Sequence, residues 1–367
     1  MDSTGEGQPR NEIEPSLGGP LVESALVFTP IRTDRLLIRP FLPEDAAGLA
    51  ARRNDPEVAR LQTWELPYSL ERAEEVVSGL VGMDGPVSEE WWMAAVADAG
   101  SGQVLGDLAL HLTWQGRSAE VGYTLAREHW GKGYATEAVD ALIEYLFQVL
   151  GVTRVSGMLH PDNVASAMVL ERAGLLFEGH TRSSFWVGDE VSDDWIYGMT
   201  RTDWETWRDR PRQPPETVSL VEVTTGNEGM VAKLATHKTQ EAFVAPMCWS
   251  FADALFPEVV DGAPVVPWMR AVVADDEIAG FVMLALRTDH HPEPFLWRLL
   301  IDRRHQRRGI GGRALDLVSE ECRSMGDSTL LTSRVEGKGS PRPYYLRHGF
   351  EPTGKIVDEE TEARKQL

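Results

Sequence analysis

The sequence has 367 residues, 42% of them hydrophobic and 25% charged, which is the composition of a globular protein rather than a disordered or fibrous one. At roughly 150 residues per domain, this length predicts two domains. The net charge of -21 argues against nucleic acid or an anionic membrane as a partner, because most of the surface would repel phosphate. The same charge favours a cationic small substrate, although surplus carboxylates also serve solubility alone.

The two cysteines, Cys248 and Cys322, are too few for a disulfide framework or a four-thiolate metal site, and they fit a reducing cytoplasm. His290 and His291 are adjacent, so their side chains would diverge along a strand, and we expect no metal. Residues 1–27 combine acidic residues with glycine and proline, without the basic flank or apolar stretch of a signal peptide. We therefore expect a flexible arm there, a cytoplasmic location and no membrane anchor.

Strand and helix patterns follow one another in the first half, residues 28–208. A short strand and a proline-bearing turn lead into a helix that begins near Pro43. Runs separated by Gly and Ser turns then predict an antiparallel meander, with strands at 91–98, 103–114 and 119–125. Apolar residues recur at helical spacing over 135–150 and predict an amphipathic helix. The remaining expected elements are a strand at 155–159, a helix at 163–174 ended by Gly174, and a closing hairpin at 185–200.

A proline-rich stretch, "RDRPRQPPETVS", interrupts regular structure at 208–219, and we place an interdomain linker at 209–216. The second half, residues 217–367, repeats the order of the first. Its expected elements are strands at 219–224, 269–275, 277–287, 294–302 and 328–334, a long amphipathic helix at 310–325, a short helix near 343–349, and terminal strands. This internal repeat predicts two domains of one fold class, α/β with a mixed sheet.

In both halves a glycine-bearing turn joins a strand to the amphipathic helix: "TLAREHWGKGYATEA" (124–138) and "LLIDRRHQRRGIGGRAL" (299–315). The first N–H groups of a helix lack internal partners and carry the positive end of its dipole, so such a turn can hold a phosphate. Glycines allow a pyrophosphate to approach the backbone, and Lys132 or Arg307 and Arg308 add charge. A single turn of this kind could be only a tight connection, but two copies in the same context favour a site for an anionic nucleotide-like ligand.

The stretch Gln306 to Gly311 matches the Q/R-x-x-G-x-G/A signature of the GNAT acetyltransferases, in which this loop holds the pyrophosphate of acetyl-CoA. The resemblance implies a GNAT fold in each half, with acetyl-CoA as cosubstrate. The residues it assigns to acetyl-CoA are Gln306, Arg307, Arg308, Gly309, Ile310, Gly311 and Gly312 in the second half, and Gly131, Lys132, Gly133, Ala135, Thr136 and Asn163 in the first.

The two halves resemble different branches of that family. "HWGKGYATEA", "TDRLLIRPF" and "DWIYGMT" make residues 28–208 similar to the RimJ/RimL-like enzymes that acetylate protein N-termini, notably of ribosomal proteins, although Glu128 stands where Gln or Arg is usual. "FLWRLLIDRRHQRRGIGGRAL" and "GKGSPRPYYLRHGFEPTG" make residues 217–367 similar to the diamine and polyamine acetyltransferases.

Acetyl transfer to an amine requires a free amine, an oxyanion site and a proton for the leaving thiolate. Only about one alkyl ammonium in a thousand is deprotonated at neutral pH, so a base is useful. Resemblance places the thiolate acid at Tyr345 in the second half. Leu170 replaces this tyrosine in the first half, where Ser166 is the candidate acid. Asn163 and Ser166 also fit a plain helix cap and first turn, and Tyr345 a core aromatic.

The base is less well marked. Glu120, at the start of "EVGYTL", is the candidate in the first half, either directly or through water. In the second half Glu293 lies in a comparable place, and three further carboxylates could bind a cationic substrate: Asp253, Glu258 and Asp261. Three tryptophans could wall a substrate cleft or belong to the core: Trp92, Trp186 and Trp195.

These patterns predict a tandem N-acetyltransferase that acylates a primary amine from acetyl-CoA without a covalent intermediate. Three alternatives stay open: one catalytic half beside a supporting half, non-catalytic acyl-CoA-binding modules, and an enzyme that acetylates aminoglycoside-type antibiotics. Protein N-termini, polyamines and other amino-bearing small molecules all stay open as acceptors, and so does a homodimer as the oligomeric state.

Overall fold

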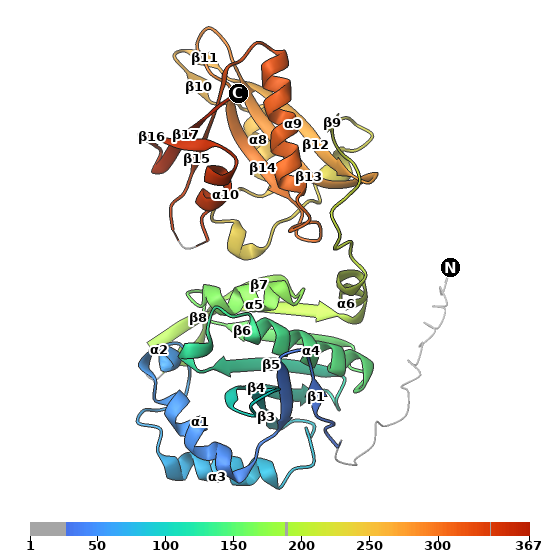
Figure 1. Ribbon diagram of the computed structural model, residues 1–367, viewed down its shortest axis with the longest axis vertical. Helices are drawn as coiled ribbons and strands as arrows, with labels where there is room; N and C mark the ends of the chain where they lie inside the picture. Colours follow the sequence, from blue (N-terminus) through green and yellow to red (C-terminus); the bar gives the residue numbers. More distant parts are fainter. Residues whose placement is uncertain (1–26, 188–189, 338) are drawn as a thin grey trace, which may run out of the picture. The chain divides into compact units, whose positions relative to one another are not determined.

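The computed structural model describes residues 27–187, 190–337 and 339–367 (Figure 1). The expected arm at 1–27 therefore lies almost wholly outside the described residues. The chain divides into two compact units between Val155 and Ser156, inside strand β6 (Arg154–Leu159), and each is described by itself. Two sheets, with strands from 31–200 and from 218–366, and the helices that pack on them confirm the expected α/β class.

The first sheet has eight strands in the order β1-β2-β3-β4-β5-β6-β8-β7. The predicted meander is present: β4 (Val104–Thr113) pairs antiparallel with β3 (Trp91–Asp98) on one side and with β5 (Ser118–Leu125) on the other. Ahead of it come β1 (Ile31–Arg32), β2 (Leu36–Pro40), α1 (Ala46–Arg53), α2 (Pro56–Ala59) and α3 (Leu70–Val81). No element was expected over 54–90, where Ser69 caps α3 by accepting the N–H of Arg72.

Helix α4 (Tyr134–Gln148) is the predicted amphipathic helix of the first half. It packs against β1, β2 and β5, and its apolar stripe is buried, including Leu142, Ile143 and Leu146. Trp92 on β3 is only 1% exposed and stacks near Phe28, so it is a core residue rather than part of a cleft wall. This packing fixes the start of α4 beside the end of β5.

The next elements are α5 (Val164–Arg172), the hairpin of β7 (Leu176–Val187) and β8 (Glu190–Thr200), and α6 (Arg201–Arg208). Helix α5 and the hairpin confirm the expected order. Helix α6 was not expected, although Thr200 and Asp203 form a capping box at its start. Trp186 on β7 is 60% exposed, and residues 209–217 contain no helix or strand.

The second sheet has seven strands in the order β16-β17-β15-β14-β13-β12-β9. Its strands are β9 (Val218–Glu222), β12 (Val266–Ala274), β13 (Glu277–Leu286), β14 (Phe295–Ile301), β15 (Thr329–Arg334), β16 (Phe350–Val357) and β17 (Glu360–Gln366). The long helix α9 (Ile310–Ser324) buries Ala314, Leu315 and Val318 against one face of this sheet. The predicted second-half strands and both predicted helices are therefore present, the shorter helix being α10 (Arg342–Arg347).

The other face of this sheet is covered by short elements that the sequence patterns did not indicate. They are α7 (Glu228–Val231), η3 (Lys238–Gln240), α8 (Met247–Leu255) and the small hairpin of β10 (Val259–Val260) and β11 (Ala263–Pro264). Val231, Leu234 and Met247 join the buried cluster around Phe281 of β13. Among the helices that the structure describes, none combines the length and apolar character needed to cross a bilayer.

Candidate active site

The glycine turn of the second half is held by a buried carboxylate. Asp302, at the end of β14, accepts the backbone N–H groups of Arg304 at 3.0 Å and Ala235 at 3.1 Å, and the Nε of Arg304 at 2.9 Å. Although burial opposes ionisation, these donors keep the pKa of Asp302 below its usual range. The turn therefore starts from a fixed anionic anchor.

Gln306, the first residue of the matched signature, braces the turn from inside. Its side-chain nitrogen donates to the carbonyl of Ile301 at 3.0 Å and to the side chain of Gln240 at 2.8 Å. Gln240 returns a hydrogen bond of 3.2 Å to the Gln306 oxygen. This amide pair ties the turn to η3, so the Gln306 side chain shapes the site rather than offering a free donor.

Helix α9 begins beyond this turn with conformations that favour glycine. Gly309 is the N-cap, with φ of 77° in the left-handed region. A side chain at Gly312 would place its first carbon 2.8 Å from the His348 ring, and one at Gly311 would lie 3.2 Å from the Tyr344 hydroxyl. The N–H of Arg313 donates to the carbonyl of Gly309 at 3.3 Å. The N–H groups of residues 310–312 come before this bond, so they have no intrahelical acceptor and can bind an anion.

The two signature arginines face different environments. Arg307 lines the cavity described below, whereas Arg308 is 5% exposed and absent from its lining. The Arg308 guanidinium donates to the carbonyl of Gln213 at 2.7 Å and lies 3.5 Å from the carboxylate of Asp275. The side chain of Arg308 is thus engaged within the protein fold, and the expectation that its charge adds to the anion site is not supported by this placement.

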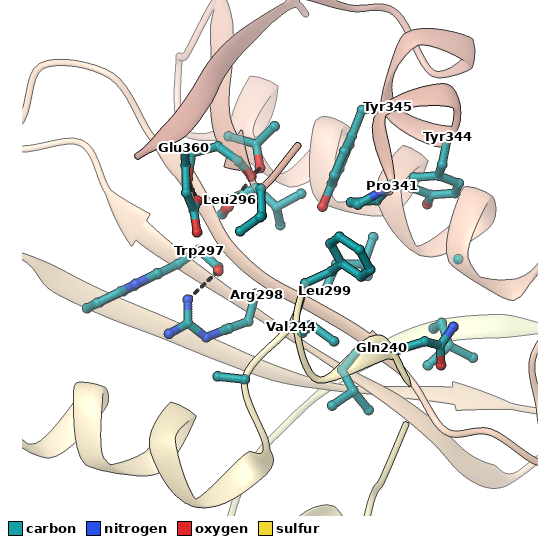
Figure 2. A pocket seen from close by; sticks show the side chains of 18 of the residues that line it. Gln240, Val244, Leu296, Trp297, Arg298, Leu299, Pro341, Tyr344, Tyr345 and Glu360 are labelled. Carbon is teal, nitrogen blue, oxygen red and sulfur yellow. Dashed lines mark hydrogen bonds between the residues drawn. The ribbon is translucent and has the colours of Figure 1, made fainter. Parts of the chain in front are cut away.

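A cavity of about 1240 Å³ opens between β14 and β15 (Figure 2). The two strands pair in parallel only at Phe295 and Leu296, and a register irregularity opposite β13 falls at Trp297. Residues 297–301 therefore continue past the end of the β15 pairing, and backbone N–H groups on that edge face the opening. Gly309, Gly311 and Gly312 line the same cavity, so the glycine turn and the diverging strands form one site.

Tyr345, the residue predicted as the thiolate acid, projects into this cavity from α10 (Figure 2). Its ring packs edge-on against Phe350, with centroids 5.4 Å apart. Burial raises the pKa of Tyr345 and a hydrogen bond with Thr332 lowers it, the net effect being a rise. The hydroxyl is therefore protonated at neutral pH, as a proton donor must be.

Tyr344 also lines the cavity but is placed differently. Its ring stacks at a tilt on His348, with centroids 4.6 Å apart, and its hydroxyl is buried without a hydrogen-bond partner among the described residues. Burial raises the pKa of this hydroxyl well above its usual value. The neighbouring tyrosines thus differ in hydrogen bonding although they share one short helix.

The carboxylates singled out from the sequence in this half are mostly engaged elsewhere. Glu293 accepts hydrogen bonds from Thr329 at 2.6 Å and Arg364 at 2.7 Å and does not line the cavity. Asp253 forms an ion pair with Arg298 at 2.7 Å. Asp261 lies in the turn between β10 and β11, while Glu258 lines the cavity and is exposed.

Glu360 and Glu362, which the sequence patterns did not indicate, face the cavity from β17. They are two residues apart and so share one face of the strand. Glu362 is buried and accepts a hydrogen bond from Thr353 at 2.7 Å, whereas Glu360 is half-buried and accepts one from Ser333. Only the pairing of β17 with β15 brings them to the site, and no local pattern signals that pairing.

The first half places its glycine turn in the same way at the start of α4. Gly133 is the N-cap with φ of 82°, Gly131 has φ of 73°, and Ala135 and Thr136 lie in the first helical turn. Lys132 is exposed. The turn is fixed by Glu137, which accepts hydrogen bonds from the Thr33 hydroxyl at 2.5 Å and Arg35 Nε at 2.6 Å, and by the Lys132 carbonyl, which accepts from Arg35.

Glu120 lies on β5 directly opposite His111 of β4, which in turn lies opposite Trp91 of β3. The His111 and Trp91 rings stack with centroids 5.0 Å apart. In the second compact unit, Asn163 caps α5 by accepting the Ser166 N–H at 3.2 Å, so the capping role considered from the sequence is confirmed.

Two family models match the chain, and each matched range contains one of the glycine turns. Residues 35–176 match a family described as "Acetyltransferase (GNAT) domain", and residues 232–350 match "Acetyltransferase (GNAT) family". The "Uncharacterized N-acetyltransferase YoaA" of Bacillus subtilis (strain 168) is 27% identical over 176 residues, 48% of this chain and 98% of that protein. The "Spermidine N(1)-acetyltransferase" of Vibrio cholerae serotype O1 is 29% identical over 77 residues, 21% of this chain and 44% of that protein.

Among solved structures, the acetyltransferase (GNAT family) from Bacillus anthracis is 24% identical and covers 47% of this chain and 98% of its own, with a TM-score of 0.43. The two family matches together take in more than two thirds of the residues, one in each half. The chain belongs to the GNAT acetyltransferases and carries two domains of that family.

Proposed function

We propose that the second-half site binds acetyl-CoA and transfers its acetyl group directly to a primary amine. The observation that carries this proposal is that the unpaired amides of the glycine turn and the Tyr345 hydroxyl open into one cavity. An anion-binding helix start and a proton donor are the two groups that a CoA thioester needs at its opposite ends.

In this proposal, the pyrophosphate lies at the N–H groups of residues 310–312, with Arg307 adding positive charge. The pantetheine arm follows β14, whose open backbone edge offers hydrogen bonds where β15 has diverged. The thioester then lies near Tyr345, and N–H groups of β14 stabilise the negative charge that develops on its carbonyl oxygen.

The amine nitrogen attacks the thioester carbon, and the carbon–sulfur bond breaks as the tetrahedral intermediate collapses. Tyr345 gives its proton to the departing sulfur. Burial suits this role because it disfavours tyrosinate in the resting site, as the raised pKa of Tyr345 reflects. No enzyme-bound acetyl intermediate is required.

The first half is proposed to use the same cosubstrate with different groups. The Gly131 to Gly133 turn serves the pyrophosphate, Asn163 contacts the pantetheine arm, Ser166 is the acid in place of tyrosine, and Glu120 is the base. The resemblance of this half to enzymes that acetylate protein N-termini favours a peptide α-amine as its acceptor.

The test is thiol release by the full chain with acetyl-CoA and a panel holding a peptide N-terminus, a monoamine and a diamine. Ser166→Ala, Tyr345→Phe and the double variant assign turnover to each half. We expect each single change to remove one set of acceptors and the double change to abolish release. Tight CoA binding without release for every amine would instead favour non-catalytic CoA-binding domains.

A further inference from the structure

The hairpin of β16 and β17 carries Glu360 into the second-half cavity. Figure 2 shows its carboxylate beside Leu296 and Trp297 of β14, across the opening from the Tyr345 hydroxyl. The negative charge of Glu360 contributes to the raised pKa of the Tyr345 hydroxyl. A carboxylate and a phenol therefore face the place where the strands diverge.

One oxygen of Glu360 is held and the other is available. The Ser333 hydroxyl on β15 donates to Oε2 in a short hydrogen bond, and the antiparallel pairing of β15 with β17 fixes that contact. For Oε1, no donor is found among the residues that the structure describes. The carboxylate is thus oriented by the sheet while keeping one acceptor position toward the cavity.

Other charged groups of the site surround Glu360 on several elements. The hairpin contributes Asp358 and Glu362 to the cavity lining, and β14 contributes Arg298. Arg334 of β15 is not part of that lining, but it is buried and its charge acts to lower the pKa of Tyr345. The remaining charged or titratable residues that line the cavity, besides the tyrosines, are Glu241, Glu258, His291, His305, Arg307, Arg347 and His348.

The other carboxylates are less suited to accept a proton at the reaction point. Glu362 is buried and bonded to Thr353, and Glu293 is occupied by Thr329 and Arg364 away from the cavity. Glu241, Glu258 and Asp358 are exposed at the rim, where solvent screens them. Glu360 alone among these groups combines partial burial with a position opposite Tyr345.

We propose that Glu360 is the catalytic base of the second-half site, taking a proton from the ammonium form of the acceptor as it enters from the acidic rim. This inference rests on the proposed function. RNH3+ gives one proton to Glu360, which releases it to solvent. The free amine then attacks, sulfur takes the Tyr345 proton as the carbon–sulfur bond breaks, and the second nitrogen proton restores Tyr345. The products are the amide, CoA thiol and one proton.

The test uses the full-length protein carrying Ser166→Ala and compares it with the same protein that also carries Glu360→Gln. Both are assayed with acetyl-CoA and either 1,4-diaminobutane or n-butylamine. The acceptor must arrive deprotonated once the base is lost. We therefore expect kcat/KM to fall about 100-fold near pH 7 and the deficit to shrink to about threefold near pH 10, because roughly a third of an alkyl amine with a pKa of about 10.4 is already free at pH 10.

Glu351→Gln is the matched control, because Glu351 is exposed on neighbouring β16 and does not line the cavity. Calorimetry that finds the same CoA stoichiometry and affinities for the Glu360 variant as for its Ser166→Ala parent establishes that the second-half site is folded and still binds. A loss that is equal at every pH, or activity equal to that of the Glu351 variant, would overturn the role of Glu360. Failure of the unsubstituted site to acetylate either amine would refute the proposed function instead.

Discussion

Replacing Tyr345 with phenylalanine removes a single oxygen from the centre of the second-half site. The edge-on packing against Phe350 and Tyr344, with centroids 5.4 and 5.3 Å away, does not involve the hydroxyl and should survive. The lost hydrogen bond with Thr332 costs about 1 kcal/mol of stability. Against a typical unfolding free energy of about 5 to 15 kcal/mol, the variant stays folded.

The effect on turnover should be far larger than the effect on folding. A positioned general acid contributes on the order of 10² to 10⁴ in rate, so we expect kcat to fall at least about 100-fold, equivalent to roughly 3 kcal/mol of transition-state stabilisation. Affinity for CoA should stay within about twofold of the original, because the glycine turn is untouched. Thiol release and calorimetry measure the two quantities, in a Ser166→Ala background so that the first half contributes no release.

Tyr344→Phe is a matched control on the same helix. Its hydroxyl is buried without a partner among the described residues, so its removal should be close to neutral for stability and for turnover. The reasoning is refuted if both variants lose activity equally, or if the Tyr345 variant turns over normally.

Three further predictions concern the turns and thiols. Gly309→Val forces a side chain into φ of 77°, costing about 1 to 2 kcal/mol, and should abolish CoA binding in the second half; because the first half is proposed to bind CoA as well, calorimetry should then count about one CoA per chain instead of about two, and an unchanged stoichiometry would contradict the anion site. Burial acts to raise the pKa of Glu137, but hydrogen bonds from Thr33 and Arg35 outweigh it and lower the pKa below its usual value. The stability that Glu137 contributes is therefore fully present above the pKa of the unfolded state and is lost as the pH falls through the pKa of the folded state. Glu137→Gln should therefore cost about 1 to 2 kcal/mol near pH 7 in denaturant titrations, with the deficit vanishing in acid; a pH-independent deficit would exclude linkage. Burial raises the pKa of Cys322 to about 12, so iodoacetamide near pH 8 should label only the exposed Cys248 of the native protein. Mass spectrometry counts the labels, and two labels on the native protein would disprove this prediction.

Long-period patterns predicted the frame of both domains. Helices α4 and α9 each bury a continuous apolar stripe, so their position follows from the sequence within one or two residues. Helix α6 could not be predicted from periodicity, because only two of its eight residues, Trp204 and Trp207, are buried apolar side chains, which is too few to show a helical repeat. The short α7 and α8 are set by packing on the sheet and have no strong pattern of their own.

Site residues could likewise be predicted where their role depends on the local sequence, and not where it depends on contacts with distant parts of the chain. Gly309 and Gly133 could be predicted because the left-handed N-cap is a local property of the turn. The side chain of Arg308 could not be placed, since its partner Gln213 is 95 positions away. Glu360 was missed for the same reason, because a cavity face exists only after β17 pairs with β15.

The engagement of Arg308 also bears on where the second domain can be cut free. Arg308 donates to the carbonyl of Gln213 at 2.7 Å, and Arg313 donates to those of Pro215 and Glu216 at 2.7 and 3.0 Å. The last residues of the proposed linker are thus hydrogen-bonded to side chains at the start of α9. A fragment that begins at 217 would lack the carbonyl acceptors of both guanidinium groups beside the second glycine turn, so a fragment that begins at 209 should be the more stable unit for assaying this domain alone.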